Sequence, residues 1–365
     1  MSFGWNHYVP VLRLKPGELW ALRYLASDVR ESVTPIVEVL PKNLGRNRSN
    51  PEGDLDVAVK VICEEIWKVW GDRNFFLDTD NVSDAAIEAH VLATFAADAL
   101  AEKLLVTPMI ALRNSSTKLS AVQRSIGVLN TGCGLRLNRG DLGKPETAGV
   151  ISELTRKLEL TPADIDLIVD LGISTGFPPF NYVRENLPQL LEWRSFTVLS
   201  GAFPKDLQDR APGVHRIPRL DWQHWVSELA VGINGARSPS FGDYTVQYGN
   251  YVEPPDRPNP SASIRYTSDT EWILMRGQGI YNKDGAGNKQ WPANALLLSE
   301  MPEFCGPAFS EGDRYIANHA GTYQQAGSPG TWIRAAINHH LVFTARQIRG
   351  VQGLVPAAKE LLSLA

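Results

Sequence analysis

The sequence alternates between short apolar runs and longer amphipathic stretches, and this alternation constrains the fold more than any other feature. Eight runs of strand length occur in the first 250 residues, and most precede a stretch whose apolar residues have helical spacing. Eight β-then-α units in one chain predict an α/β fold, a closed (β/α)8 TIM-like barrel. The runs are Tyr8–Leu14, Pro35–Leu40, Phe75–Leu77, Thr107–Leu112, Gly134–Leu137, Asp166–Val169, Phe196–Leu199 and Phe241–Gln247.

The chain is longer than a barrel requires. A barrel of this kind takes about 250 residues, whereas the chain has 365. The Pro-rich stretch 252–260 breaks regular structure, and the strand-like runs Ser263–Thr267 and Glu271–Arg276 beyond it predict a hairpin. We therefore predict a barrel over residues 1–250 and a C-terminal α+β extension over 251–365, in which the hairpin and later helices pack on or cap the barrel.

Composition excludes several classes of protein. The net charge is −4 and the pI is about 6.0, so no global charge indicates a nucleic-acid surface. The cysteines Cys63, Cys133 and Cys305 have neither metal-ligand spacing nor the spacing of a disulfide framework, which favours a reducing compartment. The sequence begins without a signal-peptide pattern and contains no apolar run of the ~18 residues that a transmembrane helix needs. We expect a cytoplasmic protein with no membrane partner.

Acidic residues stand at or near the ends of the strand-like runs, where a barrel builds its site. They are Glu38, Asp78, Asp80 and Asp170, with Asp243 as a further candidate. Carboxylates that converge at one mouth can bind Mg²⁺ or Mn²⁺, or can divide the roles of general acid and general base. The alternative is that they form ion pairs with basic residues of neighbouring strands and do no chemistry.

Basic residues occupy equivalent places, and they are Lys15, Arg113 and Arg136. Guanidinium groups bind phosphates and carboxylates through paired hydrogen bonds, so this basic set favours a small anionic or nucleotide-like ligand. The alternative is that it neutralises the acidic set. His339 is a further candidate, as a general base near the mouth. The adjacent His340 points about 100° away on a helix, so the two cannot act as a zinc pair, and a structural role in the core is the alternative.

Other catalytic motifs are absent from the sequence. Ser200-Gly201 lacks the flanking residues of a nucleophile elbow. Gly277-Gln278-Gly279 lacks the third glycine and the helix of a dinucleotide-binding loop. The sequence therefore leaves the cofactor unknown, with Mg²⁺ or Mn²⁺ as the possibilities that the acidic set allows.

Seven segments, taken in order, resemble the beta protein family, whose namesake is the beta protein of a satellite phage. They are YVPVLRLKPGELWAL, TPIVEVLP, FLDTD, FGDY, SIRYT with WILMRG, FSEGDRYI and WIRAAINHH, and they extend from about residue 8 to about residue 345. Family members occur in phages, satellites and bacterial defence islands, and the namesake lies beside a gene whose product harms the host. The resemblance implies a link to anti-phage defence and partners among neighbouring gene products. It implies no reaction and assigns no functional residue.

Two functions follow from these observations. The first is a hydrolase of the phosphodiester type, in which the acidic set provides metal ligands or a base and the basic set holds an anionic substrate. The second is a non-catalytic regulatory or antitoxin-like module, which restrains a toxic partner or senses a phage component. We favour the enzyme because barrels with charged mouths usually catalyse a reaction.

Overall fold

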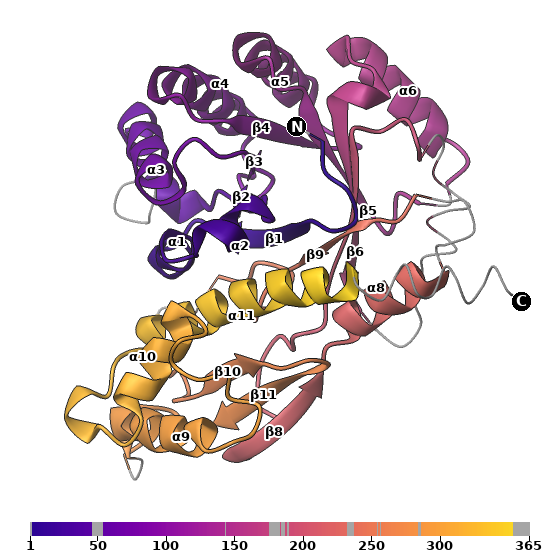
Figure 1. The fold of residues 1–365 in the computed structure, drawn as a ribbon. Coiled ribbons are helices and arrows are strands. Elements are labelled where there is room, and N and C mark those ends of the chain that lie inside the picture. Colours follow the sequence, from indigo (N-terminus) through magenta and orange to yellow (C-terminus); the bar gives the residue numbers. More distant parts are fainter. Residues whose placement is uncertain are drawn as a thin grey trace, which may run out of the picture.

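The centre of the molecule is a closed barrel of parallel strands (Figure 1). The computed structural model describes residues 2–45, 54–142, 144–174, 183, 187, 190–231, 237–253, 255, 257–283 and 286–352. Strand order around the barrel is β1-β2-β3-β4-β5-β6-β7-β9, and β9 pairs with β1 to close it. The strands are β1 (Tyr8–Arg13), β2 (Ile36–Glu38), β3 (Phe75–Asp78), β4 (Val106–Ala111), β5 (Cys133–Asn138), β6 (Ile165–Ile173), β7 (Ser195–Gly201) and β9 (Ser240–Asp243). The predicted barrel is confirmed.

Helices alternate with these strands and cover the outside of the barrel. Several begin at capping side chains: Asp54, Asp84 and Ser115 accept hydrogen bonds from backbone N–H groups of α3, α4 and α5. None of the helices in the described part of the chain is long and apolar enough to cross a membrane. Half of the predicted helix Tyr182–Trp193 lies outside the described residues. The helical segments up to residue 231 are α1 (Pro16–Arg23), α2 (Ser27–Glu31), η1 (Pro41–Leu44), α3 (Leu55–Trp70), α4 (Ala85–Glu102), α5 (Ser116–Leu129), α6 (Thr147–Leu158), η2 (Pro162–Asp164) and α8 (Leu220–Val231).

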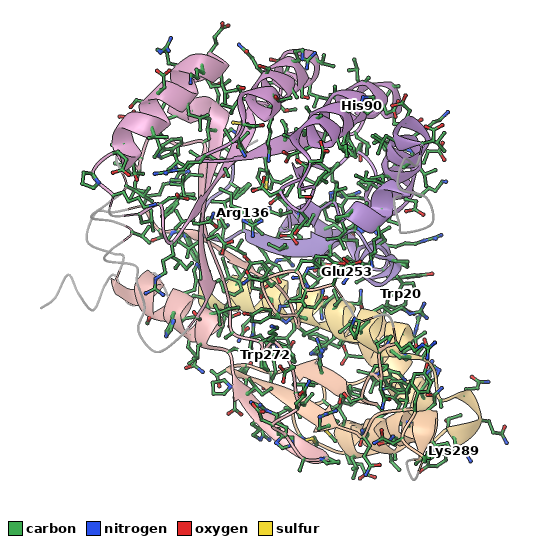
Figure 2. All side chains as sticks on the ribbon, turned by 180° about the vertical axis from the view of Figure 1, so that it is seen from behind. Trp20, His90, Arg136, Glu253, Trp272 and Lys289 are labelled. Carbon is green, nitrogen blue, oxygen red and sulfur yellow. The ribbon has the colours of Figure 1, made fainter. Side chains whose placement is uncertain are left out.

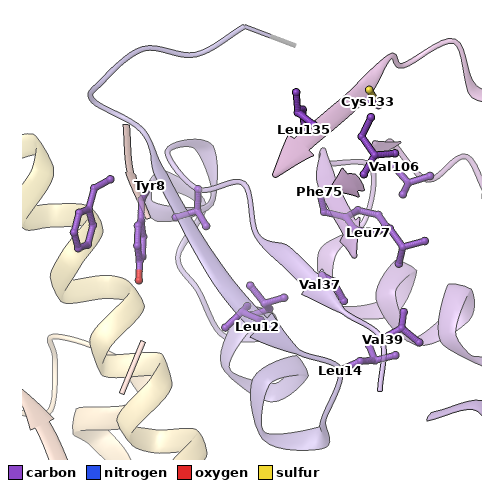
Figure 3. Close-up of a cluster of buried hydrophobic side chains, with 14 of the residues drawn as sticks. Tyr8, Leu12, Leu14, Val37, Val39, Phe75, Leu77, Val106, Cys133 and Leu135 are labelled. Carbon is purple, nitrogen blue, oxygen red and sulfur yellow. The ribbon is translucent and has the colours of Figure 1, made fainter. Parts of the chain in front are cut away.

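Side chains along each strand alternate between the barrel interior and the layer beneath the helices. The outer layer includes Tyr8, Leu12, Val37, Phe75 and Leu135 (Figure 3). The interior cluster consists of Val9, Val11, Ile36, Phe76, Met109, Ile168, Leu199 and Tyr244. Since every second residue faces inward, the interior series continues into charged residues at the carboxyl ends of several strands.

A second, three-stranded antiparallel sheet lies below the barrel in Figure 1. Its strands β10 (Ile264–Thr267) and β11 (Glu271–Arg276) form the hairpin that the sequence predicts. The third strand, β8 (Gly213–Pro218), pairs with β11 although it lies between β7 and α8 in the chain. The sequence does not predict this strand, because five of its six residues are exposed or half-exposed and give no apolar run. The division of the chain at residue 250 stays a prediction. Strand β8 precedes that residue but pairs with β11, which follows it.

The long helix α11 (Pro329–Gln352) runs between the two parts of the molecule (Figure 1). It packs on α1 and β1 of the barrel and on β10 of the second sheet. Its residues Ile337, Leu341 and Ala345 join the barrel core, whereas Trp332 joins the core of the second sheet. The remaining helical segments of this part are α9 (Gln290–Ser299), α10 (Glu311–His319), η3 (Gly287–Lys289) and η4 (Tyr323–Gln325). The hairpin of the second sheet is therefore inserted between the last barrel strand and the helix that completes the barrel, whereas its third strand, β8, precedes the last barrel strand.

If α11 completes the barrel, truncation of its buried face must destabilise the whole chain. Leu341 is fully buried, and we expect Leu341→Ala to lower the free energy of unfolding by about 2–5 kcal/mol. The matched control is Leu297→Ala on α9, whose side chain is 54% exposed, with an expected loss below ~0.5 kcal/mol. Urea denaturation followed by circular dichroism measures both, and equal small losses would contradict this role of α11.

Candidate functional site

The interior side chains at the carboxyl ends of the strands form a charged layer around Arg136 of β5, which lies inside the barrel (Figure 2). Nη1 of Arg136 donates to Asp78 Oδ2 at 2.6 Å and to Glu38 Oε1 at 3.2 Å. Its Nη2 and Nε donate to Asp170 Oδ2 at 2.8 and 3.1 Å. One guanidinium group therefore joins three carboxylates, which come from β2, β3 and β6.

Tyr244, which follows β9, completes the layer. Its hydroxyl donates to Asp170 Oδ2 at 2.6 Å and accepts from Arg136 Nη2 at 2.9 Å. The other oxygen of Asp170 accepts from the backbone N–H of Gly172, and Asp78 Oδ1 accepts from the N–H of Asp80. Both oxygens of Asp78 and of Asp170 thus have hydrogen-bond partners.

Glu38 differs from the other two carboxylates. Its Oε2 is buried and has no hydrogen-bond partner among the described residues, and Arg13 Nε lies 3.6 Å away. Burial raises the pKa of Glu38, and the charge of Asp78 adds to this effect while Arg136 opposes it. Tyr244 and the three carboxylates raise the pKa of Arg136 well above its usual value, despite burial. The layer therefore holds one permanent central cation and one incompletely bonded carboxylate.

Arg13 and Tyr244 belong to the layer, although the sequence analysis did not select them. Arg13 faces inward because it follows Val9 and Val11 at every second position of β1. Its Nη2 donates to the carbonyls of Tyr248 and Gly249, at 2.7 and 2.8 Å, and so holds the segment after β9 against β1. The alternation of inward and outward side chains along β1 could have predicted that Arg13 belongs to the layer.

Lys15 lies just beyond β1, at the same end of the barrel. Burial lowers its pKa, Glu18 and Glu38 oppose this shift, and Arg13 adds to it. Its Nζ lies 5.5 Å from the centroid of the Tyr251 ring, within cation–π distance. No carboxylate forms an ion pair with Lys15 in the part of the chain that the structure describes.

Asp80 and Arg113 do not join the layer. Asp80 forms an ion pair with the buried Lys118, which also contacts Glu88 at 2.7 Å. Arg113 points to the surface, where it pairs with Glu146 at 3.3 Å and remains 61% exposed. The predicted basic set is therefore not assembled, since Lys15 and Arg136 lie at the mouth and Arg113 does not.

The structure places Asp243 and His339 away from the mouth as well. Asp243 faces outward from β9, where it accepts from the Tyr8 hydroxyl at 2.7 Å and lies 2.8 Å from His340 Nε2. His339 Nδ1 lies 2.8 Å from Asp313 Oδ2, and its Nε2 lies 2.8 Å from the carbonyl of Thr267. Both residues are fully buried, so their contacts match the structural alternative.

The arrangement of the carboxylates does not fit the Mg²⁺ or Mn²⁺ that the sequence left open as one use of the acidic set. The described residues contain no group of three His, Cys, Asp or Glu side chains placed to hold a metal ion. Arg136 stands between Glu38, Asp78 and Asp170 and bonds to each of them. A guanidinium group thus occupies the place that a shared cation would need.

The sequence matches a known family over most of its length. The family described as Beta protein matches residues 8–346, nearly the whole chain. The chain belongs to the beta protein family. No curated protein and no solved structure shows significant similarity to it. The resemblance inferred from the sequence is thus confirmed, and the charged layer of this beta protein family member has to be interpreted from its own geometry.

Removal of Arg136 is expected to leave three carboxylates buried without their shared cation. Arg136→Gln should lower the free energy of unfolding by about 3–5 kcal/mol at pH 7. The control is Arg156→Gln, because Arg156 is 71% exposed and its pair with Glu153 lies on the surface, so the expected loss is below ~0.5 kcal/mol. Urea denaturation of both variants and the wild type measures the difference.

The destabilisation by Arg136→Gln should also depend on pH. The raised pKa of Glu38 means that the folded chain keeps this proton to a higher pH than the unfolded chain. Stability linked to such a group is present at low pH and is lost as pH rises through the folded-state pKa. Without Arg136 to oppose the shift, the variant should lose more stability than the wild type between pH 5 and 7. A deficit that does not change with pH would contradict the assigned ion pairs.

Proposed function

We propose that this chain is a hydrolase that acts on an anionic, phosphate-bearing substrate at the carboxyl ends of the barrel strands. The observation that carries the proposal is the state of Glu38, a buried carboxylate with one oxygen that has no hydrogen-bond partner among the described residues. A carboxylate with a raised pKa in such a place is suited to general acid–base chemistry. Lys15, close enough to interact electrostatically with Glu38, supplies a cation for the substrate.

The reaction can be written for a phosphodiester. A water molecule attacks phosphorus and transfers one proton to Glu38, while the bond from phosphorus to the leaving oxygen breaks. The protonated Glu38 then returns its proton to the leaving oxygen, so that charge and atoms balance. Lys15 holds a phosphoryl oxygen, where negative charge is present throughout the reaction.

The other members of the layer have a positioning role in this proposal. Asp78 and Asp170 have both oxygens engaged, so they cannot accept a further proton without loss of a bond to the layer. Arg136 fixes Oε1 of Glu38, and Oε2 is the oxygen that has no hydrogen-bond partner among the described residues. The proposal therefore assigns proton transfer to Glu38 alone and omits Arg113, which lies at the surface.

A non-catalytic module is the second candidate, and one observation favours it. Most charges of the layer satisfy one another, as in ion-pair clusters that only support a fold. In that case the protein binds a toxic partner, or a phage component, through its surface. Such a module forms a stable complex with the product of a neighbouring gene and does not depend on Glu38.

The proposal includes a setting in anti-phage defence, which is supported by the family resemblance. It also includes a cytoplasmic location, supported by cysteines without disulfide spacing. Both parts can be tested together, by phage challenge of bacteria that express the chain, with its natural neighbouring genes present.

If the chain is a hydrolase, substitution of two residues at the barrel mouth should change its kinetic constants, whereas substitution of one surface residue should not. Glu38→Gln should lower the turnover of a phosphodiester such as bis(p-nitrophenyl) phosphate by about 100-fold or more, because general acid–base groups contribute at least this much. Lys15→Met should raise KM, whereas Arg113→Gln should change neither constant. Steady-state kinetics measures these effects, with thermal melting to show that each variant is folded.

The same variants separate the two candidates in the phage challenge. Loss of protection with folded Glu38→Gln, but not with Arg113→Gln, supports the enzyme. The hydrolase is wrong if folded Glu38→Gln protects as well as the wild type and the wild type hydrolyses no phosphodiester. Co-purification of a neighbouring gene product with both variants would then support the binding module.

A further inference from the structure

A cavity lined by no residue of the charged layer lies where the barrel loops meet the second sheet. Its volume is about 620 Å³, within the usual range for sites that bind small molecules. One side is formed by residues 206–208, between β7 and β8, and by residues of the segment between β9 and β10. The other sides are formed by β10, β11, α9 and the first turns of α11.

Two arginines of the second sheet line this cavity, Arg265 on β10 and Arg276 on β11. Arg265 donates to the carbonyl of Val246 at 2.6 Å, and Arg276 donates to the carbonyls of Leu207 and Gly277 at 3.2 and 2.7 Å. These partners are backbone groups without charge. Neither arginine forms an ion pair with a carboxylate in the part of the chain that the structure describes.

Several arginines of the described chain lack a carboxylate partner, including Arg30 and Arg237, which also donate to backbone carbonyls. Arg265 and Arg276 are the two that line this cavity. Arg136, Arg194 and Arg216 each have a carboxylate partner. Burial lowers the pKa of Arg265 to about 10, and no acidic group opposes the shift. A desolvated guanidinium without a counter-ion costs free energy that a bound anion can offset.

The charge balance of the cavity also favours an anion. Asp206 is the one carboxylate among the described lining residues, and it is exposed, with Oδ1 accepting from the N–H of Gln208. The hydrogen bonds of these arginines within the described residues use Nη1 of Arg265 and Nε and Nη1 of Arg276, and none uses Nη2. Two forked donors on adjacent strands of one sheet are suited to the oxygens of a phosphate group.

The rest of the lining provides a surface for an organic group and is already formed. Trp291 and Trp332 stack with ring centroids 6.3 Å apart and line the cavity together with Ile333. Asn259 packs so closely on Gly279 that a Cβ there would lie 2.5 Å from the amide nitrogen. The Asn259 side chain thus packs tightly on Gly279 in this part of the wall.

We propose that this cavity binds a phosphorylated small molecule of about mononucleotide size. Its phosphate group lies on Arg265 and Arg276, and its organic part lies against the wall of Trp332 and Ile333. The site is separate from the charged layer of the barrel, so the proposal goes beyond the hydrolase and does not depend on it.

Isothermal titration calorimetry tests the proposal with AMP as the probe and with adenosine as its uncharged counterpart. The wild type should bind AMP at least about tenfold more tightly than adenosine, because a charge-assisted hydrogen bond is worth this much or more. Arg276→Gln should weaken AMP binding by about tenfold or more. Arg216→Gln, on the neighbouring strand β8 and outside the cavity lining, should leave binding unchanged.

Several results would overturn the proposal. It is wrong if neither AMP nor inorganic phosphate binds the wild type at millimolar concentration, or if Arg276→Gln binds AMP as the wild type does. Arg265→Gln is a second test, and Arg276→Gln decides alone if that variant does not fold. Glu38→Gln should bind AMP normally, since loss of binding there would place AMP at the barrel mouth and refute the separate site.

Discussion

The charged end of the barrel depends on one guanidinium group, that of Arg136. It donates hydrogen bonds to carboxylates of β2, β3 and β6 and to the hydroxyl of Tyr244. Without this cation, three acidic side chains would be buried close together without compensation. Buried ion pairs often add little net stability, so we interpret the layer chiefly as a device that fixes geometry. It holds Glu38 in one orientation and leaves a single oxygen of that residue without a hydrogen bond.

The fold was predictable from the sequence because strands and helices differ in their apolar period, and eight units of that kind allow few architectures. The convergence of Glu38, Asp78, Arg136 and Asp170 was predictable for the same reason, since each stands at the carboxyl end of a strand. For Asp243, the sequence pattern could not decide whether the side chain faces the barrel interior or the outer layer. Successive residues of β9 face opposite sides, so a shift of one position reverses the answer. Gly242 faces inward there, and Asp243 therefore faces α11. Arg113 stands two residues beyond the end of β4, where the strand no longer fixes its direction.

Contacts between distant parts of the chain account for the rest of what the sequence did not reveal. The adjacent histidines of α11 point in different directions, as residues on a helix must. His339 bonds to Asp313 and to the backbone of β10, whereas His340 reaches Asp243 of the barrel. These two adjacent histidines thus connect α11 to both parts of the molecule. The sequence around them does not predict which residues they contact. The strand β8 was missed for a related reason, since its identity depends on pairing with β11.

The position of α11 has a consequence for the order in which the chain acquires its structure. Asn338 of α11 donates to the carbonyl of Ala21, which lies 317 residues earlier in the sequence. During synthesis from the N-terminus, the first strand and helix of the barrel cannot contact α11 until the second sheet has also been synthesised. Contacts of such long sequence separation slow folding and leave apolar surface exposed in the meantime. The growing chain is therefore expected to rely on chaperones for longer than a barrel whose final helix directly follows its final strand.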